Sequence, residues 1–482
     1  MRDLTAIALN TAKSHGASYA DIRILQITIE DLTVRNGELG EMRQDESLGF
    51  GVRVIVDGAW GFAAGPSVTK KDIQKTTVQA CRIAKASARL KKGSVRLTKE
   101  EVVDTAWQTP VVIDPFRVPV TEKLDLLFRI DEILRKDRRI IVAESTMGCV
   151  RERQWLATSE GTFIDQTLTR TGAGYSATAV EKSEVQKRSY PMSFGGQYMG
   201  MGYELVKGLS LIENAEKTRE EAVALLTAKP CPAGKKDLVL DGTQLALQIH
   251  ESVGHPSELD RVLGIEENYA GRSFLTLEKY GKFRYGSDQV TLMADSTVPG
   301  GLATFGYDDD GVRAQRWPVV RNGIFVGYHT NREFAPVLKA GGSRGCCRAD
   351  SWASLPMIRI TNLSLMPGDR TLDELIADTK DGILMCTNKS WSIDQMRYNF
   401  QFGCEVGWEI KKGKLGAMLK NCTYQGITPE FWGSCDAVCN GDHWTLWGVV
   451  NCGKGQPGQT AEMSHGAAPA RFRRITVGVG RK

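Results

Sequence analysis

The sequence lacks a long apolar run and carries little net charge. No uninterrupted apolar stretch approaches the roughly 20 residues that a membrane-spanning helix needs. The first residues, MRDLTAIALN, include no long apolar segment behind a basic start, so we expect no secretory signal, no membrane span and a cytoplasmic location. The 62 basic and 57 acidic residues leave a net charge of +5 and gather on no single stripe, which argues against direct nucleic-acid binding.

The sequence also lacks the regular cysteine spacing of a disulfide framework. Its eleven cysteines are odd in number and irregularly spaced, which is typical of reduced thiols. Four of them match no zinc-finger or zinc-ribbon spacing, and we interpret them as core thiols: Cys404, Cys422, Cys435 and Cys439. The vicinal pair Cys346 and Cys347 is interpreted as structural.

The first half of the sequence alternates helical and strand patterns. Helical periodicity predicts four helices, over residues 2–14, 69–91, 121–136 and 203–227. Strand patterns fill residues 19–65 and 139–189, with an Asn-Gly turn at 36–37 and an Asp-Gly turn at 57–58 that both indicate hairpins. These patterns predict an N-terminal α/β domain over residues 1–228, with a mixed sheet and helices.

The pattern of predicted helices and strands changes after KPCPAGKK, residues 229–236, which we interpret as a linker. Short strand patterns alternate with glycine-rich turns through most of 285–482, and helical pieces are expected at 243–253 and 371–378. The predicted fold class is therefore α+β, with a β-rich C-terminal domain over 237–482 that resembles a barrel or a sandwich.

The most informative segment is HESVGHPSELD, in which two histidines lie five positions apart around a glutamate. On a regular α-helix, His250 and His255 would diverge by about 140° and could not share one ion. Gly254 and the proline after His255 allow the helix to bulge or end there, which would bring the two histidines together. Glu251 is placed as the base that activates a metal-bound water. The alternative is a pair of unrelated core or surface histidines.

The segment before this motif predicts its position on a helix. DLVLDG reads as a strand, Thr243 can cap the helix that follows, and apolar residues bury one side of that helix. A catalytic zinc site needs three protein ligands and an open position. Besides a cysteine, the residues that could supply the third ligand are Glu258, Asp260, His329, His443 and His465.

Cys452 is a well-placed candidate for the third ligand. It ends an apolar strand at the mouth of the glycine-rich loop GKGQPGQ, where the backbone can approach an ion closely. This loop lacks the spacing of a phosphate-binding loop. Two further interpretations stay open: a hydrolase that uses Cys452 as a nucleophile with His465, although no pattern orients that pair, and a calcium-like loop at YDDDG, residues 307–311, for which we favour a solvated turn.

HESVGHPSELD and NCGKGQPGQ together resemble the TldD/PmbA family, and specifically its TldD-type zinc metalloprotease members. The resemblance extends through LGFGVRVIVDGAWGFAAG, FGYDDDGVRAQRWPVVRNGIFVGY and GCEVGWEIKKGKLGAMLKNCTYQG, and so covers nearly the whole chain. It implies that His250, His255 and Cys452 bind Zn²⁺ and that Glu251 is the catalytic base. PmbA-type subunits lack the metal motif, which this chain retains.

The same resemblance implies a function and a partner. The chain is expected to be a zinc-dependent peptidase that hydrolyses small or unfolded peptides. It is expected to form a homodimer, or a heterodimer with a PmbA-type subunit, that encloses the site. The alternative is a non-catalytic zinc-containing interaction or regulatory subunit of such a complex. The presence of Glu251 argues against that alternative, because a purely structural zinc site needs no base.

Overall fold

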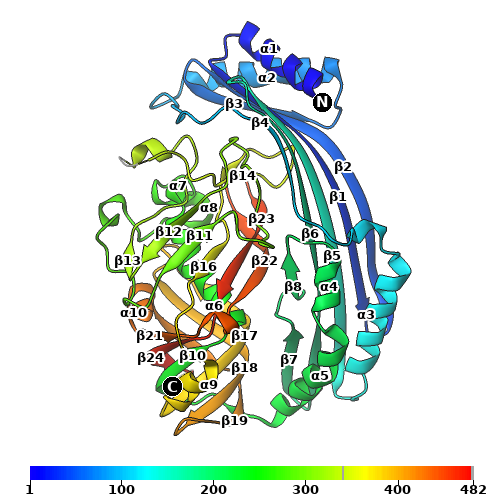
Figure 1. The fold of residues 1–482 in the computed structure, drawn as a ribbon, viewed down its shortest axis with the longest axis vertical. Coiled ribbons are helices and arrows are strands. Elements are labelled where there is room, and N and C mark those ends of the chain that lie inside the picture. Colours follow the sequence, from blue (N-terminus) through cyan, green and yellow to red (C-terminus); the bar gives the residue numbers. More distant parts are fainter. Residues whose placement is uncertain (339–340, 479–482) are drawn as a thin grey trace.

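Two large sheets organise the chain, of which the computed structural model describes residues 1–338 and 341–478 (Figure 1). Within these residues the first sheet has eight strands: β1 (Tyr19–Arg35), β2 (Glu38–Val56), β3 (Ala59–Gly65), β4 (Asp104–Gln108), β5 (Ile140–Thr158), β6 (Phe163–Glu181), β7 (Glu184–Tyr190) and β8 (Gln197–Met199). Their order is β3-β2-β1-β5-β6-β4, and β7 and β8 also pair with β6. Because β4 runs parallel to β6 and β1 antiparallel to β2, the sheet is mixed, as predicted.

The two predicted hairpin turns connect the first three strands. Asn36 and Gly37 have φ values of 53° and 83°, and Asp57 and Gly58 have values of 51° and 73°. Positive φ at both central residues is what a two-residue type I′ turn requires, and Asn-Gly and Asp-Gly meet this requirement at low cost. The turns therefore fix the register of β1 against β2 and of β2 against β3.

Helices cover the first sheet at its two ends (Figure 1). Near one end α1 (Arg2–Ser14) and α2 (Lys70–Ala88) pack on β1 to β3, and near the other α3 (Val120–Leu134) and α5 (Leu211–Thr227) pack on β5 and β6. The single helix predicted over 203–227 is wrong, because α4 (Glu204–Gly208) ends before α5 begins. Ser210 between them has a φ of 49°, in the left-handed region that interrupts a helix.

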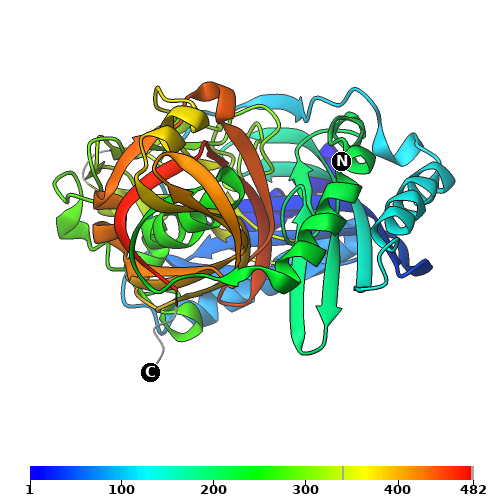
Figure 2. The same ribbon diagram turned by 90° about the horizontal axis from the view of Figure 1, so that it is seen from below.

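The second sheet closes into a barrel. In the described residues it contains β9 (Lys229–Pro230), β10 (Gly234–Leu240), β17 (Asp381–Ile393), β18 (Asn399–Lys411), β19 (Lys414–Lys420), β20 (Thr423–Ile427), β21 (Cys435–Val438) and β24 (Ala470–Val477). The order β17-β10-β24-β20-β18 closes because β17 also pairs with β18. The helix α6 (Gly242–Ile249) is buried along its whole length and lies inside the ring of strands (Figure 2). The predicted β-rich second half is confirmed.

Smaller elements flank the barrel. The remaining strands are β11 (Leu292–Asp295), β12 (Arg316–Arg321), β13 (Ile324–Phe325), β14 (Cys347–Arg348), β15 (Met357–Ile358), β16 (Leu363–Leu365), β22 (Thr445–Lys454) and β23 (Gln459–Ala467). The remaining helices are α7 (Leu259–Val262), α8 (Glu267–Ala270), α9 (Leu372–Ala377) and α10 (Thr428–Gly433). In the part of the chain that the structure describes, no helix is long and apolar enough to cross a membrane.

The segment interpreted as a linker lies within the second sheet at both of its ends. Lys229 and Pro230 pair with β19, and Gly234 to Lys236 pair with β24. The Pro/Gly/Lys segment therefore marks the place where the chain enters the second sheet, and it is not a free linker between domains. The division into residues 1–228 and 237–482 stays a prediction.

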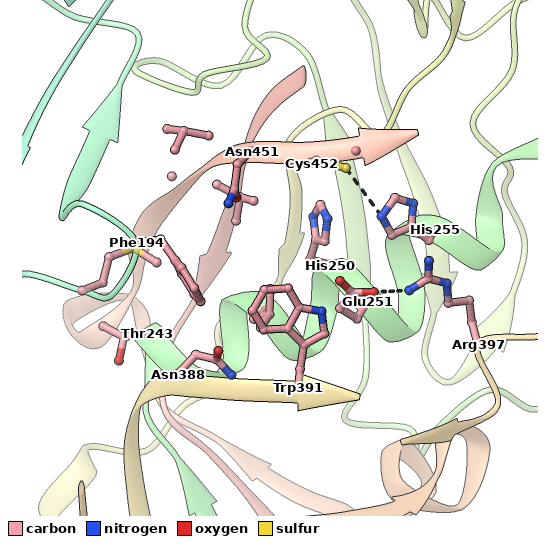
Figure 3. A pocket seen from close by; sticks show the side chains of 16 residues that line it. Phe194, Thr243, His250, Glu251, His255, Asn388, Trp391, Arg397, Asn451 and Cys452 are labelled. Carbon is pink, nitrogen blue, oxygen red and sulfur yellow. Dashed lines mark hydrogen bonds and ion pairs between the residues drawn. The ribbon is translucent and has the colours of Figure 1, made fainter. Parts of the chain in front are cut away.

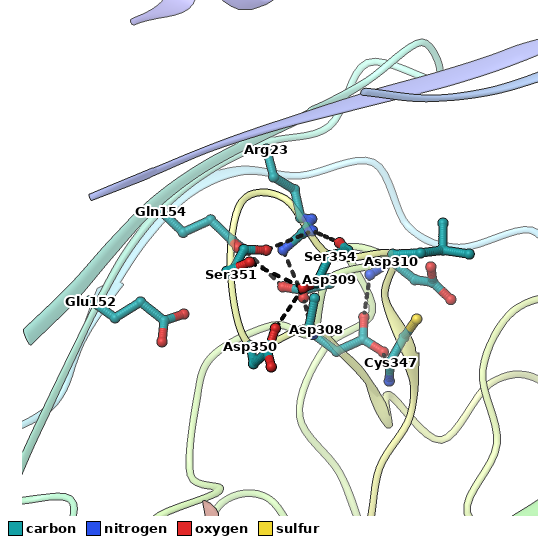
Figure 4. A network of polar contacts seen from close by, with 12 residues as sticks. Arg23, Glu152, Gln154, Asp308, Asp309, Asp310, Cys347, Asp350, Ser351 and Ser354 are labelled. Atoms are coloured by element: carbon teal, nitrogen blue, oxygen red, sulfur yellow. Dashed lines mark hydrogen bonds and ion pairs between the residues drawn. The ribbon is translucent and has the colours of Figure 1, made fainter. Parts of the chain in front are cut away.

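The three aspartates of YDDDG are buried in a loop of the second half that lies against strands of the first sheet (Figure 4). Asp309 accepts a hydrogen bond from Arg23 on β1 at 3.1 Å, and Asp310 accepts one from Arg53 on β2 at 2.9 Å. Asp308 accepts backbone N–H groups of its own turn, and burial raises the pKa of its carboxyl well above the ordinary value. The solvated-turn interpretation is therefore wrong. The calcium-like alternative gains no support either, because these carboxylates face N–H donors.

Candidate metal centre

The helix that carries the histidine motif begins at Asp241. The Asp241 side chain accepts a hydrogen bond from the Gln244 backbone N–H at 3.0 Å, which satisfies one of the free donors at the helix start. Thr243, which the sequence predicts as the cap, instead donates its hydroxyl to Asp241 at 2.7 Å. The cap is therefore two residues earlier than predicted. Because α6 has no solvent-facing side, its end is held firmly inside the barrel.

The predicted bulge lies directly after α6. Residues 250–254 form one wide π-type turn, in which the N–H of His255 bonds the carbonyl of His250 five residues earlier. The wide turn corrects the five-residue spacing, and the two imidazole centroids lie 4.8 Å apart. Gly254 has an ordinary helical φ of −60°, so its role is close packing. A Cβ there would lie 2.8 Å from Ile360 Cδ1.

Cys452 joins the two histidines from β22. The candidate ligand atoms of His250, His255 and Cys452 all lie within 4.8 Å of one another, and all three side chains are buried (Figure 3). The pairing of β22 with β23 shifts its register between Val449 and Cys452. Two imidazole nitrogens and one thiolate form a donor set that suits tetrahedral zinc, with the fourth position open to a substrate or water. The residues present therefore fit a zinc ion.

The acid–base properties of Cys452 agree with this arrangement. Its Sγ lies 3.5 Å from His255 Nε2. Burial would raise the pKa of the thiol, but His255 outweighs that effect and lowers the pKa below its ordinary value. Burial lowers the pKa of His250, which keeps that imidazole neutral. A thiolate and a neutral imidazole are the forms that bind a metal.

Glu251 lies beside the three ligand candidates and contacts Arg397. Arg397 occupies the turn between β17 and β18, and its Nη1 donates to Glu251 Oε2 (Figure 3). Burial would raise the pKa of Glu251, but Arg397, followed by His255 and His250, outweighs burial and lowers it. No local sequence pattern indicates Arg397, because only the barrel brings it to Glu251.

A buried ion-pair cluster supports His255. The Nδ1 of His255 lies 2.9 Å from Glu258 Oε2, while Lys454 Nζ lies 3.1 Å from Glu258 and 2.8 Å from Asp260. Burial would raise the pKa of Glu258, but Lys454 and His255 lower it well below the ordinary value. Burial raises the pKa of Asp260 to about 6. Glu258 and Asp260 are thus committed to other contacts and are not free to be a third ligand.

The remaining histidine candidates lie in other environments. His465 Nε2 lies 2.8 Å from His250 Nδ1, and His329 Nδ1 lies 3.0 Å from Ser257 Oγ. His443 accepts a hydrogen bond from the backbone of Leu372 at the start of α9, far along the chain from the motif. Since Cys452 contacts His255, the proposed nucleophile pair of Cys452 with His465 is not the pair that the structure forms.

The other cysteines form no second metal group within the described residues, where the grouped ligand candidates are those of Cys452 and the two histidines. All eleven cysteines lie in those residues and are free of disulfide bonds, as expected for reduced thiols. The four predicted core thiols and the vicinal pair are all buried: Cys346, Cys347, Cys404, Cys422, Cys435 and Cys439.

The metal candidates face a cavity of about 210 Å³. Phe194, from the segment between β7 and β8, and Trp391 of β17 also line it. These two rings pack edge to face with centroids 5.4 Å apart, yet each stays about 40% exposed, at 40% and 42% respectively (Figure 3). Both halves of the chain therefore contribute to the space in front of Glu251.

Comparisons with known proteins identify metallopeptidase domains along the chain. Residues 20–84, 113–228 and 233–478 match the three domains described for PmbA/TldA metallopeptidases: domain 1, the central domain and the C-terminal domain. A metalloprotease of Methanocaldococcus jannaschii is 28% identical over 454 residues, which cover 94% of this chain and 95% of that protein. A TldD homologue of Haemophilus influenzae, also named a metalloprotease, is 25% identical over 465 residues, covering 95% of this chain and 92% of that protein.

A solved structure shares the fold along the full length. TldE from Thermococcus kodakarensis superposes with a TM-score of 0.75 at 15% identity, and the match covers 98% of this chain and 99% of that one. The relatives' names support a metal-dependent peptidase activity. With family domains that run from residue 20 to residue 478, the chain belongs to the TldD/PmbA family of metallopeptidases.

Proposed function

We propose that this chain is a zinc-dependent peptidase that hydrolyses small or unfolded peptides. His250, His255 and Cys452 would hold the zinc ion, and Glu251 would act as the general base. The observation that carries the proposal is the convergence of these four buried side chains on one cavity. A purely structural zinc site is usually closed by four ligands, whereas a three-ligand set beside a carboxylate is typical of hydrolases.

The mechanism assigns separate tasks to Glu251 and Arg397. Zinc, when bound, supplies a Lewis acid for the scissile carbonyl and the attacking water. Glu251 takes the proton of that water and later gives it to the leaving amine. Arg397 keeps Glu251 ionised, which is the form that can accept a proton. Glu251 lines the same cavity as the three proposed ligands, as this role requires.

The surroundings of the cavity support a peptide as the substrate. Within the described residues β22 pairs only with β23, and Val449, Val450 and Asn451 of β22 line the cavity, so an extended peptide would pair with β22 at these residues. Strand addition of this kind gives little sequence preference. We also propose that the chain works as a homodimer or as a heterodimer with a PmbA-type subunit, and the fold shared with a TldE structure supports such a partner.

The aromatic pair at the cavity is expected to bind an apolar side chain of the peptide. Trp391→Ala should lower kcat/KM about tenfold for peptides with a large apolar residue near the scissile bond, and much less for glycine-rich peptides. Parallel kinetics on the two peptide sets measure this difference. Phe128→Ala is the control, since Phe128 is an exposed ring on α3, away from the cavity. Equal losses on both peptide sets would contradict a side-chain subsite.

Removal of the metal tests the proposed function directly. Purified protein should contain about one zinc per chain, because one ligand set is present. A chelator should abolish the cleavage of unfolded peptides, and added zinc should restore it. Peptide cleavage that a chelator leaves untouched, once the zinc has been shown to be gone, would overturn a metal mechanism. Bound zinc with no cleavage of any peptide would favour the non-catalytic interaction subunit.

Cys452→Ala should lose zinc and activity together. This change deletes one of three ligands, so both the bound zinc and the turnover are expected to fall at least tenfold. Elemental analysis and peptide cleavage on the same sample provide the measurement. Cys435→Ala is a matched control, because Cys435 is equally buried on β21 and lies outside the ligand group. A variant at Cys452 that keeps its zinc would remove this residue from the ligand set.

A further inference from the structure

We propose that His465 is a positioning residue for the metal centre. It would fix the imidazole of His250 in the one neutral form that leaves Nε2 free to bind the ion. This inference rests on the proposed role of His250 as a ligand, and it adds a residue that the TldD-type motif does not include. The geometry that carries it is a chain of two hydrogen bonds from a backbone carbonyl to His250.

The first hydrogen bond fixes the proton of His465. Its Nδ1 lies 2.9 Å from the carbonyl oxygen of Leu363 on β16. A carbonyl oxygen only accepts, so Nδ1 must carry the hydrogen. The His465 side chain is fully buried on β23, and a charged imidazolium without a carboxylate partner is costly there. His465 is therefore neutral, and its Nε2 is an acceptor.

The second hydrogen bond fixes the proton of His250. Its Nδ1 lies 2.8 Å from the acceptor Nε2 of His465, so Nδ1 of His250 donates. The Nε2 of His250 then has a free lone pair, as metal binding requires. With the opposite tautomer, His465 would lose its hydrogen bond to Leu363, and its Nε2–H would donate to Nδ1 of His250. The hydrogen of a neutral His250 would then lie on Nε2, which could not bind the ion. The backbone of β16 thus determines, through His465, which nitrogen of His250 binds the ion.

The two histidine ligands are held by different acceptors. His255 donates to the carboxylate of Glu258 at 2.9 Å, and Lys454 balances that charge. His250 donates to a neutral imidazole that needs no counter-charge within reach. His255 is therefore oriented by an ion-pair cluster, and His250 is oriented by the neutral side chain of His465. This difference keeps the number of buried charges near the ion low, since each further carboxylate would need its own cation.

Two amide substitutions separate positioning from packing. The amide oxygen of His465→Gln lies near the place of Nε2, and it can accept the hydrogen of His250. The shorter amide of His465→Asn lies near the place of Nδ1, where it can still donate to Leu363 but cannot reach His250. Both variants are polar and of similar size, so a general loss of packing affects them alike. His329→Gln is the control for the loss of a fully buried histidine that contacts neither zinc-binding imidazole through a hydrogen bond.

The measurement is zinc affinity by competition with a chromogenic chelator, on full-length protein whose folding is checked by thermal unfolding. His465→Asn should bind zinc roughly 10- to 100-fold more weakly, the usual cost of losing a partner behind a metal ligand. His465→Gln and His329→Gln should stay within about threefold of the unchanged protein, well short of that cost. Equal affinities for His465→Asn and His465→Gln would overturn the positioning role. An unchanged protein that binds no zinc would instead overturn the proposed function.

Discussion

Glu251→Gln is expected to keep its zinc and to lose peptidase activity by roughly 10² to 10⁴, the usual contribution of a general base. Glutamine preserves the size and shape of the side chain but cannot accept the proton of the attacking water. None of the three ligand candidates changes, so elemental analysis should still find about one zinc per chain. Turnover of an unfolded peptide and zinc content, measured on the same sample, test both parts.

The control for Glu251→Gln must separate a loss of catalysis from a loss of folding stability. Arg397 loses its carboxylate partner in this variant, so thermal unfolding should be measured alongside turnover. Glu216→Gln removes an exposed carboxylate from α5 and should leave activity unchanged. Full activity in Glu251→Gln would rule out the proposed base. Chelator resistance in addition would point to a thiol mechanism, in which Cys452 and His255 form the reacting pair.

Lys454→Met is expected to destabilise the protein by about 3–5 kcal/mol, the usual cost of removing one partner of a buried ion pair. The ammonium group of Lys454 is fully buried between Glu258 and Asp260. Methionine fills a similar volume, so the loss comes from the two carboxylates that remain without their cation. Urea unfolding in the presence of a chelator provides the measurement, because bound zinc would add its own stabilisation.

A surface ion pair serves as the control for Lys454→Met. Lys236 contacts Asp381, whose side chain is more than half exposed, and Lys236→Met should cost less than about 1 kcal/mol. A loss at Lys454 as small as this would mean that the buried cluster is not held by charge. Addition of zinc to Lys454→Met should recover less stability than in the unchanged protein, because Glu258 also orients His255.

Much of the geometry of the candidate metal centre was predictable from one short segment. The spacing of His250 and His255 excluded a regular helix, and the glycine and proline beside His255 indicated the bulge that the structure contains. The position of Cys452 before a glycine-rich loop was also informative, because the backbone can approach an ion closely there. These signals lie within short segments, so they can be recognised in the sequence before the fold is known. The assignment of three ligands to zinc still came from the family resemblance.

The residues that orient the site were not predictable in this way. Arg397 is 146 positions from Glu251, and His465 is 215 positions from His250, so only the folded chain brings each pair together. Lys454 has a weak local signal, because it follows Cys452 by two positions on a strand and so faces the same side. The single helix predicted over 203–227 is wrong because a left-handed Ser210 has no clear sequence signature.

The sequence of the aspartate turn predicts exposure to solvent, because a run of like charge normally lies at the surface. Its partner Arg23 lies 286 positions before Asp309, so no local pattern connects them. The ion pair exists only where the fold lays β1, which carries Arg23, against this turn. A sequence pattern shows how many charges a segment carries, but not whether an opposite charge will be folded onto it.

That turn has a consequence for exchanging parts between relatives. Asp309 and Asp310, in the second half, are neutralised by Arg23 and Arg53 of the first half. A chimera that took its opening 228 residues from another member of the family would bury these carboxylates unmatched unless the donor supplied both arginines. Exchange of the first half of this chain is therefore constrained by two buried ion pairs that are distant in sequence from the proposed zinc ligands. Donor sequences can be screened for the two positions before any gene is assembled.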